Sequence, residues 1–286
     1  MKFSIVIPTL NEEGSIARCL ETIWGGTERP DEILVVDGLS SDTTCAIAAR
    51  LRARVCLNQA RHAARGRNIG IKKATGDIIV FTDADCVPRE DWLAQIKEAF
   101  RKDIELEGVG GPMVALEPCS RVEAFWGRVF LQEIMHFPDE SFVVRERIFR
   151  GGFLTANCAY KRETLLRLGG FDEWFGNNAE DIDLFWRAID VGARLRYLPS
   201  AVVAHSFSPT IPAMVRKNFR NGVSSSKLQK RYGKWFQVDE DLYRILLSNI
   251  LGLIVRKPDA DLYCIQLTSH LLGKYYGSLR VGVINL

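Results

Sequence analysis

The sequence predicts an α/β protein with a mostly parallel, Rossmann-like sheet flanked by helices and with a helical extension at the C-terminus. Short apolar runs alternate with amphipathic stretches over the first hundred residues, at the spacing of right-handed β-α-β units. Beyond about residue 210 the apolar stretches are amphipathic at helical spacing. The chain has 286 residues, of which 47% are hydrophobic, so it can bury a large core.

Four apolar runs predict the strands, over residues 2–8, 31–38, 53–58 and 77–83. In a parallel sheet of this kind, ligands bind at the carboxyl ends of the strands. Thr9, Asp37 and the pair formed by Asp83 and Asp85 follow these runs. The sequence therefore predicts a binding site at that edge of the sheet.

The stretches between the strands predict helices. The first begins near Asn11 and ends at Gly25-Gly26, and the second is capped within residues 40–42 and carries Ile47 and Leu51. A third covers about residues 64–74. The fourth covers residues 89–100, with Pro88 in its first turn because proline is tolerated there.

Composition and charge are those of a globular protein, with 26% charged residues and a net charge of +3. The seven cysteines are spread along the chain without a C-x-x-C pair, which indicates reduced thiols in the cytosol instead of a disulfide frame or a zinc site. The apolar run at the N-terminus is short and closed by Pro8, and no run reaches the ~18 residues of a spanning helix. We therefore expect a cytoplasmic protein.

A nucleotide is the expected ligand of such a sheet, but the usual phosphate loops are missing. After the first strand stands "PTLNEEGS", which has neither G-x-G-x-x-G nor a Walker A lysine. Dinucleotide enzymes and P-loop ATPases are therefore disfavoured.

The pair Asp83 and Asp85 predicts a cation site. Along a strand, side chains at i and i+2 point the same way, so both carboxylates can face one ligand. Mg²⁺ or Mn²⁺ commonly bridges carboxylates and substrate phosphates and neutralises a departing diphosphate. The alternative is a plain turn or helix cap, where aspartate is also common.

Five blocks of sequence, in order, resemble glycosyltransferase family 2 with its GT-A fold. They cover residues 4–16, 32–44, 64–85, 151–173 and 179–192, within about residues 1–205. The resemblance implies transfer of a sugar from a nucleoside-diphosphate sugar to an acceptor hydroxyl, mostly with inversion. It also implies a nucleotide-sugar half over residues 1–110 and an acceptor half over 111–210. Residues 211–286 lie beyond the resemblance, and their own pattern predicts a helical, membrane-associating region.

The resemblance implies roles for residues on the nucleotide side. Pro8, Thr9 and Glu12 would contact the nucleoside, and Asp37 would hydrogen-bond the base. Asp37 could instead be a turn residue before Gly38. Arg67 lies in the block that lines the nucleotide side of the cleft, although Arg61, Arg65 and Arg67 could equally form a solvated helix face.

The resemblance also implies the metal ligands. Asp83 would meet the ribose or the metal, and Asp85 would bind Mn²⁺ or Mg²⁺ directly. His205, at the end of a later apolar run, matches a metal-binding histidine of several family members, although a lone histidine in such a place is usually structural.

The pair Glu180 and Asp181 opens a helix whose apolar positions include Ile182, Phe185 and Ile189. Acidic residues are favoured in a first helical turn by the helix dipole, which is one explanation of the pair. The family resemblance implies that Asp181 is the general base and that Glu180 contacts the acceptor hydroxyl. Displacement at an anomeric carbon needs such a carboxylate to take the acceptor proton.

The C-terminal region predicts contact with an anionic membrane. Residues 216–234 carry seven Lys or Arg and no acid, followed by Trp235 and Phe236 and by amphipathic segments at 243–255 and 267–279. No nucleic-acid motif accompanies this run, so nucleic acid is not the expected partner. A solvated helix face packed on the catalytic domain is the alternative.

Two absences narrow the reaction. The sequence has no Q-x-x-R-W motif of the processive synthases and none of the spanning helices through which such synthases thread polymer, so addition of a single sugar to a glycan or lipid-linked acceptor is expected. Residues 121–150 match nothing specific and predict an acceptor-side helix and a loop that becomes ordered with ligand.

A non-catalytic sugar-nucleotide-binding or scaffold protein of the same fold is the competing hypothesis, and a nucleotidyltransferase is a weaker one.

Overall fold

The computed structural model describes residues 1–148, 153–233 and 239–283, with the side chains of residues 239 and 240 excepted. The chain forms two compact units. The first consists of Met1–Leu116 and Phe130–Ser206, and the second of Glu117–Val129 and Phe207–Leu286. The division of residues 1–210 into a donor half and an acceptor half stays a prediction.

The first unit contains all the described strands and the helices that cover them. The strands are β1 (Phe3–Thr9), β2 (Glu32–Asp37), β3 (Arg54–Leu57), β4 (Ile78–Phe81), β5 (Cys86–Pro88), β6 (Gly108–Gly110), β7 (Met113–Ala115), β8 (Phe142–Val144), β9 (Cys158–Lys161), β10 (Leu195–Tyr197) and β11 (Val203–His205). The helices are α1 (Ile16–Gly25), α2 (Thr44–Arg50), α3 (Ala63–Lys73), α4 (Trp92–Lys102), α6 (Arg162–Arg167) and α7 (Glu180–Asp190).

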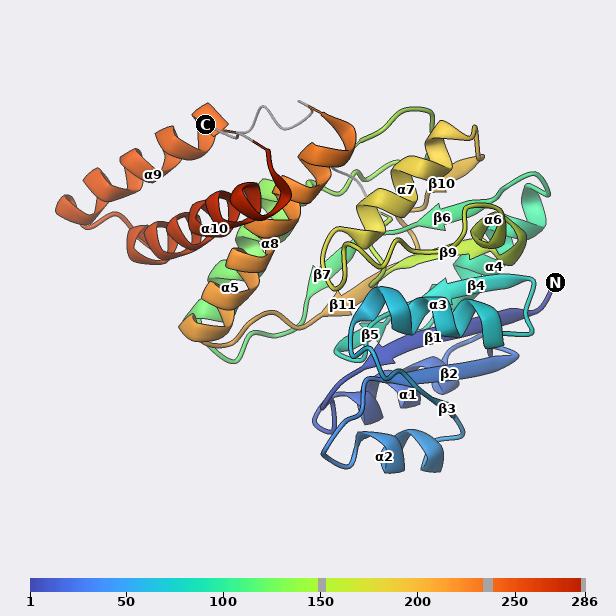
Figure 1. The fold of residues 1–286 in the computed structure, drawn as a ribbon. Coiled ribbons are helices and arrows are strands. Elements are labelled where there is room, and N and C mark those ends of the chain that lie inside the picture. Colours follow the sequence, from blue (N-terminus) through green and yellow to red (C-terminus); the bar gives the residue numbers. More distant parts are fainter. Residues whose placement is uncertain (149–152, 234–238, 284–286) are drawn as a thin grey trace. The chain divides into compact units, whose positions relative to one another are not determined.

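Among the described residues, the main sheet has eight strands in the order β3-β2-β1-β4-β9-β6-β10-β8 (Figure 1). The four strands predicted from the sequence pair in parallel, as do β6 and β10, whereas β9 and β8 run antiparallel to their neighbours. A mostly parallel sheet flanked by helices confirms the predicted fold class.

Both faces of the sheet are covered by helices, as the β-α-β pattern predicts. On one face Ile5 and Ile7 pack into a core with side chains of α1 and α4. On the other face α3 approaches β1 closely, because Gly70 has no side chain. A Cβ at Gly70 would lie 2.3 Å from Cγ1 of Val6, so only glycine fits there. This close contact holds α3, and with it Arg67, against the strands.

A smaller sheet, in the order β5-β11-β7, lies beside the end of β4. β5 and β11 pair antiparallel, and the register places His205 opposite Cys86. Two segments more than a hundred residues apart in the sequence are thereby joined at the carboxyl end of the main sheet, next to Asp85.

Two predicted helix boundaries are wrong. α1 begins at Ile16 and not near Asn11, because Asn11 adopts a left-handed conformation (φ 56°) and the backbone N–H groups of Asn11 and Glu12 donate to the hydroxyls of Ser40 and Thr44. Pro88 ends β5 opposite Val203 and precedes α4, which starts at Trp92. Pairing with β11 therefore overrides the local preference of proline for a helix start.

Residues 121–148 are more regular than the predicted helix and loop. They form α5 (Arg121–Arg128), a π-helical segment (Val129–Met135) and β8 at the edge of the main sheet. Residues 149 and 150 of the predicted loop lie outside the described residues. The edge strand forms because Val144 and its neighbours pair with β10, a contact that local sequence does not reveal.

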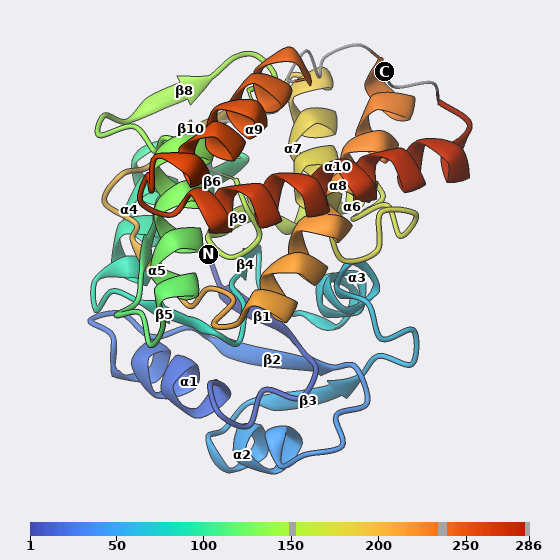
Figure 2. The same ribbon diagram turned by 90° about the vertical axis from the view of Figure 1, so that its left-hand side faces the viewer.

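The second unit is helical, as expected for the C-terminal extension. It contains α5, α8 (Ile211–Tyr232), α9 (Asp239–Ile254) and α10 (Ala260–Val281), and α10 contacts both α8 and α9 (Figure 2). None of the described helices is long and apolar enough to cross a bilayer. Lys234, Trp235 and Phe236, which the sequence singled out, lie outside the described residues.

Candidate active site

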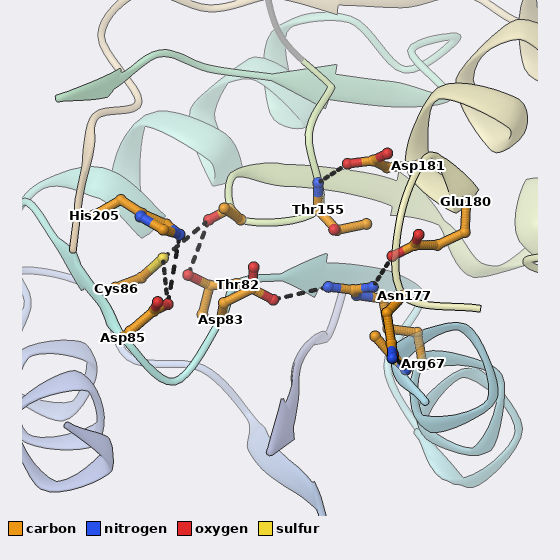
Figure 3. A network of polar contacts seen from close by, with 12 residues as sticks. Arg67, Thr82, Asp83, Asp85, Cys86, Thr155, Asn177, Glu180, Asp181 and His205 are labelled. Carbon is orange, nitrogen blue, oxygen red and sulfur yellow. Dashed lines mark hydrogen bonds and ion pairs between the residues drawn. The ribbon is translucent and has the colours of Figure 1, made fainter. Parts of the chain in front are cut away.

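The turn after β4 carries the two aspartates. β4 ends at Phe81, so Asp83 and Asp85 do not lie on a strand, and the alternation expected from strand geometry is wrong. Thr82 anchors the turn by donating its hydroxyl to the carbonyl of Ala156 at 3.0 Å. The turn sends the two carboxylates to different partners: Asp83 reaches Arg67, and Asp85 lies beside His205 (Figure 3).

Asp85, Cys86 and His205 form a cluster that could hold a cation. Nε2 of His205 lies 3.6 Å from Oδ1 of Asp85, and one donor atom from each of the three residues lies within 4.8 Å of the others. Asp85 and His205 are partly exposed, whereas Cys86 is buried. The pairing of β5 with β11 places these donors together.

The chemistry of this donor set fits Mn²⁺ or Mg²⁺. Burial, and then the charges of Asp85 and Asp83, raise the pKa of the Cys86 thiol well above its usual value. A neutral thiol is a poor ligand, because the thiolate is the form that binds metals. The available donors are therefore a carboxylate and an imidazole, with the second carboxylate on the same turn, and carboxylates suit Mn²⁺ and Mg²⁺.

Arg67 connects the aspartate turn to helix α7. Its Nη2 donates to Oδ1 of Asp83 at 2.8 Å and its Nη1 donates to Oε1 of Glu180 at 2.6 Å. Arg67 and Glu180 are each only 3% exposed. A guanidinium presents several donors in one plane, so it can hold two carboxylates at once. Arg67 thus spans the two acidic parts of the site (Figure 3).

The start of α7 holds the second acidic pair. Ala179, just before the helix, has a left-handed backbone (φ 67°), and Glu180 and Asp181 occupy the first turn. The carboxylate of Asp181 accepts hydrogen bonds from the backbone N–H of Ile182 at 2.9 Å and from the backbone N–H of Thr155 at 3.4 Å. Of the predicted apolar positions on this helix, Phe185 is buried, but Ile182 and Ile189 are only partly so. Asp183, paired with Arg187, lies on the buried side.

Burial raises the pKa of both carboxyl groups in this pair. The pKa of Glu180 rises to about 7, because burial outweighs the opposing effect of Arg67 and the Asp181 charge adds to the rise. Burial also raises the pKa of Asp181, although the positive charge of Arg67 opposes the rise. One oxygen of Glu180, Oε2, is buried with no hydrogen-bond partner among the described residues. A buried oxygen without a partner is costly, so a donor from a ligand is expected to satisfy it.

The raised pKa of Glu180 predicts that the free energy of unfolding falls as pH rises from 4.5 to about 7. Between pH 4.5, the ordinary pKa, and about 7, the folded state holds a proton on Glu180 that the unfolded chain has released. The stabilisation from this proton is therefore complete below the pKa that Glu180 has in the unfolded chain. It is lost as pH rises towards the pKa that Glu180 has in the folded state, at up to about 1.4 kcal/mol per pH unit. Urea unfolding in EDTA across this range should show the decline in the wild type and a smaller one in Glu180→Gln. Equal pH dependence in the two proteins would contradict the assignment.

The predicted nucleoside-side residues lie at the ends of β1 and β2. Asp37 is 1% exposed, and it accepts the hydroxyl of Ser40 at 2.5 Å, the backbone N–H of Ser40 at 2.8 Å and the hydroxyl of Thr9 at 3.2 Å. Burial opposes ionisation, but the Ser40 hydrogen bonds prevail and the pKa of Asp37 lies below its usual value. Asp37 is thus an ionised group held at the sheet edge.

Two further nucleoside-side candidates flank this group. Pro8 is half-buried one residue before Thr9 on β1. Glu12 lies in the following loop with its carboxylate 2.6 Å from the Ser15 hydroxyl. Burial, despite that hydrogen bond, raises the pKa of Glu12, and the charges of Asp85 and Asp83 add to the rise. The charges of Glu12 and the aspartate turn therefore influence one another.

The three arginines that the sequence left open have different surroundings. Arg61 is exposed, and Arg65 is exposed and ion-paired with Glu173 at 3.0 Å. Arg67 is buried in the acidic network. Arg67 is therefore the one of these three that lies with the other candidate site residues.

Comparison with known proteins identifies the family. The model of glycosyl transferase family 2 matches residues 4–145, and that of glycosyl transferase family group 2 matches residues 78–281. The chain belongs to glycosyltransferase family 2. The predicted resemblance is thereby confirmed.

Curated relatives of this family 2 chain include glycosyltransferases. A pre-mycofactocin glycosyltransferase of Mycobacterium tuberculosis is 27% identical over 247 residues, which are 80% of this chain and 48% of that protein. An O-antigen chain rhamnosyltransferase of Salmonella typhimurium is 24% identical, over 90% of this chain and 83% of its own length. The chain thus spans about half the length of the first of these relatives.

Solved structures of glycosyltransferases share the fold. A mannosyltransferase from Pyrobaculum calidifontis, in complex with GDP-Man and Mn²⁺, has a TM-score of 0.66 at 20% identity, covering 96% of this chain and 86% of that one. Glucosyl-3-phosphoglycerate synthase from Mycobacterium tuberculosis, in complex with Mn²⁺, UDP and glucosyl-3-phosphoglycerate, has a TM-score of 0.58 at 20% identity, covering 81% and 80%. These likenesses show that this family 2 chain has the GT-A fold.

Sequence reasoning missed two contributors to the family 2 site. Cys86 directly follows Asp85 and lies in the wall of the cation cluster without being one of its available donors; its place there comes from β11, and a lone cysteine carries no signal of that pairing. Thr155 donates its backbone N–H to Asp181, and a backbone donor has no sequence signature. Both depend on contacts between distant segments.

Proposed function

We propose that the chain is a metal-dependent, inverting glycosyltransferase that moves one sugar from a nucleoside-diphosphate sugar to an acceptor hydroxyl. The observation that carries the proposal is the acidic network at the carboxyl edge of the sheet. There Arg67 joins Asp83, on the turn that carries Asp85, to Glu180, beside Asp181. A cation site and a base are thereby held in one frame.

The proposed roles follow from the chemistry of these side chains. Asp181 takes the proton of the acceptor hydroxyl while the acceptor oxygen bonds to the anomeric carbon. The bond from that carbon to the diphosphate breaks, and its electron pair leaves with the diphosphate. Glu180, through its unpartnered Oε2, contacts the acceptor hydroxyl.

The cation would be Mn²⁺, with Mg²⁺ as the alternative, held by Asp85 and His205. When bound it supplies positive charge that stabilises the departing diphosphate. The two solved structures described above contain Mn²⁺ with a nucleotide or nucleotide sugar, which supports this choice. Pro8, Thr9, Glu12 and Asp37 would contact the nucleoside, and Asp83 the ribose or the metal.

A non-catalytic sugar-nucleotide-binding protein is the second candidate function. One relative, named an inactive polypeptide N-acetylgalactosaminyltransferase-like protein from Mus musculus, is 26% identical over 71% of this chain and 52% of its own length. A pure binder needs no base, so the Glu180-Asp181 pair and its raised pKa values favour the transferase.

A donor screen tests the proposal. We expect one sugar nucleotide from a panel of UDP-, GDP- and dTDP-sugars to be hydrolysed slowly in the presence of Mn²⁺, and not in EDTA, because water can replace the acceptor. The measurement is nucleoside diphosphate release, with thermal shift as an independent readout of binding. A thermal shift with a nucleotide sugar but without any release, even with Mn²⁺, would favour the binding protein.

The acceptor is proposed to be a glycan or a lipid-linked sugar, with attachment of one sugar per acceptor. We place the protein in the cytoplasm, in peripheral contact with an anionic membrane through the basic residues within 216–234. Nucleic acid is not a proposed partner.

A further inference from the structure

We infer that α9 and α10 form a membrane-inserting surface, which we call the apolar face. The inference adds a site of apolar insertion to the electrostatic contact proposed above. It rests on the proposed function only in its consequence that the acceptor is lipid-linked. The surface itself is argued from the second unit alone.

Helix α9 exposes one continuous apolar side. Its members follow helical spacing and are at least 41% exposed: Tyr243, Leu247, Ile250, Leu251 and Ile254. Leu247 is 59% and Ile254 78% exposed. Monomeric proteins rarely leave so many large apolar side chains together in water, so this side is expected to have a partner.

Helix α10 extends the same surface. Leu272, Tyr275, Tyr276 and Leu279 lie on one side of α10, and Leu279 is 85% exposed. The hydroxyls of Tyr243 and Tyr275 are hydrogen-bonded to each other, so the two apolar sides meet at these tyrosines. Tyrosine is enriched at the level of lipid head groups, because its ring is apolar and its hydroxyl polar.

The opposite side of α10 is packed closely against α8, so the α10 part of the apolar face has a firm support. A Cβ at Gly273 would lie 2.0 Å from the carbonyl oxygen of Phe219, and one at Gly222 would lie 2.0 Å from that of His270. Glycine at both positions lets the two backbones touch. Ser226 adds a hydrogen bond to the carbonyl of Lys274 at 2.8 Å. The exposed side of α10 therefore belongs to a helix that is firmly packed along its other side.

The charges around the apolar face suit anionic lipid. Arg244 and Arg280 flank it by helical position, and Arg256 and Lys257 follow the end of α9, all four exposed. Asp259 and Asp261 are ion-paired with Arg121. Residues 207–286 contain twelve Lys or Arg and five Asp or Glu, a net charge of +7, whereas the whole chain carries +3.

This charge favours lipid over a second copy of the chain as the occupant. Two copies facing each other would bring two +7 regions together, which like-charge repulsion opposes. Anionic head groups attract the basic rim while the acyl boundary accepts the apolar side chains. Since none of the described helices can span a bilayer, the expected mode is shallow insertion parallel to the surface.

Vesicle sedimentation tests the inference without any donor or acceptor. The full chain is mixed with phosphatidylcholine vesicles that contain or lack phosphatidylglycerol, at low and at high salt. We expect binding to the anionic vesicles, with a fraction that survives high salt because apolar insertion is not screened. The variant Leu247→Gln/Ile250→Gln/Ile254→Gln/Leu279→Gln should lose that fraction and bind roughly tenfold or more weakly.

A matched control changes four exposed apolar side chains of the first unit, Leu57→Gln/Ile104→Gln/Leu166→Gln/Val191→Gln, each at least 50% exposed. This control should bind vesicles like the wild type. The variant Arg216→Gln/Lys217→Gln/Arg220→Gln on α8 should weaken binding at low salt and keep the salt-resistant fraction.

Three outcomes would overturn the inference. The wild type could stay in the supernatant with anionic vesicles at low salt. The apolar-face variant could bind as tightly as the control. Light scattering could show a wild-type dimer that this variant disperses, which would make the face a contact between copies. Mn²⁺-dependent donor hydrolysis in detergent should be the same in the wild type and this variant, so a failure of the proposed function would appear separately.

Discussion

Asp85→Ala is expected to abolish metal-dependent binding of a nucleoside diphosphate, whereas Asp83→Ala should only weaken it. Asp85 lies 3.6 Å from His205 with its carboxylate in the candidate cation cluster. Asp83 is already ion-paired with Arg67 at 2.8 Å, so its charge is partly compensated within the protein. Removing Asp85 therefore removes a metal ligand, and without the metal the remaining acids repel the diphosphate.

Calorimetry of a nucleoside diphosphate with Mn²⁺ and with EDTA measures this effect. Glu90→Ala, an exposed acid five residues along the chain, is the matched control and should bind like the wild type. His205→Ala should resemble Asp85→Ala in direction. Wild-type affinity that is the same in EDTA would show that no metal takes part in binding.

Asp181→Asn is expected to leave donor affinity unchanged and to reduce sugar transfer by a factor on the order of 10² or more, the range of general-base loss. Asparagine is nearly isosteric and can still accept from the backbone N–H groups of Ile182 and Thr155, but it cannot take a proton. The loss should therefore appear in kcat and not in donor binding.

Asp190→Asn, at the other end of the same helix, is the matched control. Its carboxylate pairs with Arg147 on the surface, where an ion pair contributes little, so transfer should stay near the wild-type rate. Unchanged turnover in Asp181→Asn would instead assign Asp181 to a structural role at the start of α7, as the helix dipole alone allows.

The two acidic pairs show which features of the site could be predicted from the sequence. Asp83 and Asp85 could be selected because they follow a predicted strand. Glu180 and Asp181 were selected through the family resemblance, because acids in a first helical turn also have a purely local explanation. The reason given for the first pair was wrong, since β4 ends before Asp83 and a turn directs the two carboxylates apart. The residues were therefore predictable, but their orientation was not.

The boundaries that failed have one cause. Asn11 and Pro88 both have local preferences that suggest a helix start, yet one lies in a loop bonded to Ser40 and the other pairs with β11. Contacts with segments that are distant in sequence outweigh local helix-start preferences, which for an N-cap residue are about 1 kcal/mol.

The sequence by itself determined the α/β class, the parallel pairing of the first strands, the resemblance to family 2 and the edge of the sheet that carries the acidic residues. These follow from hydrophobic periodicity and short motifs, which are local. The tertiary structure alone decided that Arg67 joins Asp83 to Glu180, which lies 113 residues after Arg67 in the chain. It alone also decided that β11 places His205 beside Asp85. It also decided which side of α9 and α10 stays exposed, because burial depends on how helices pack and amphipathic spacing alone does not say against what.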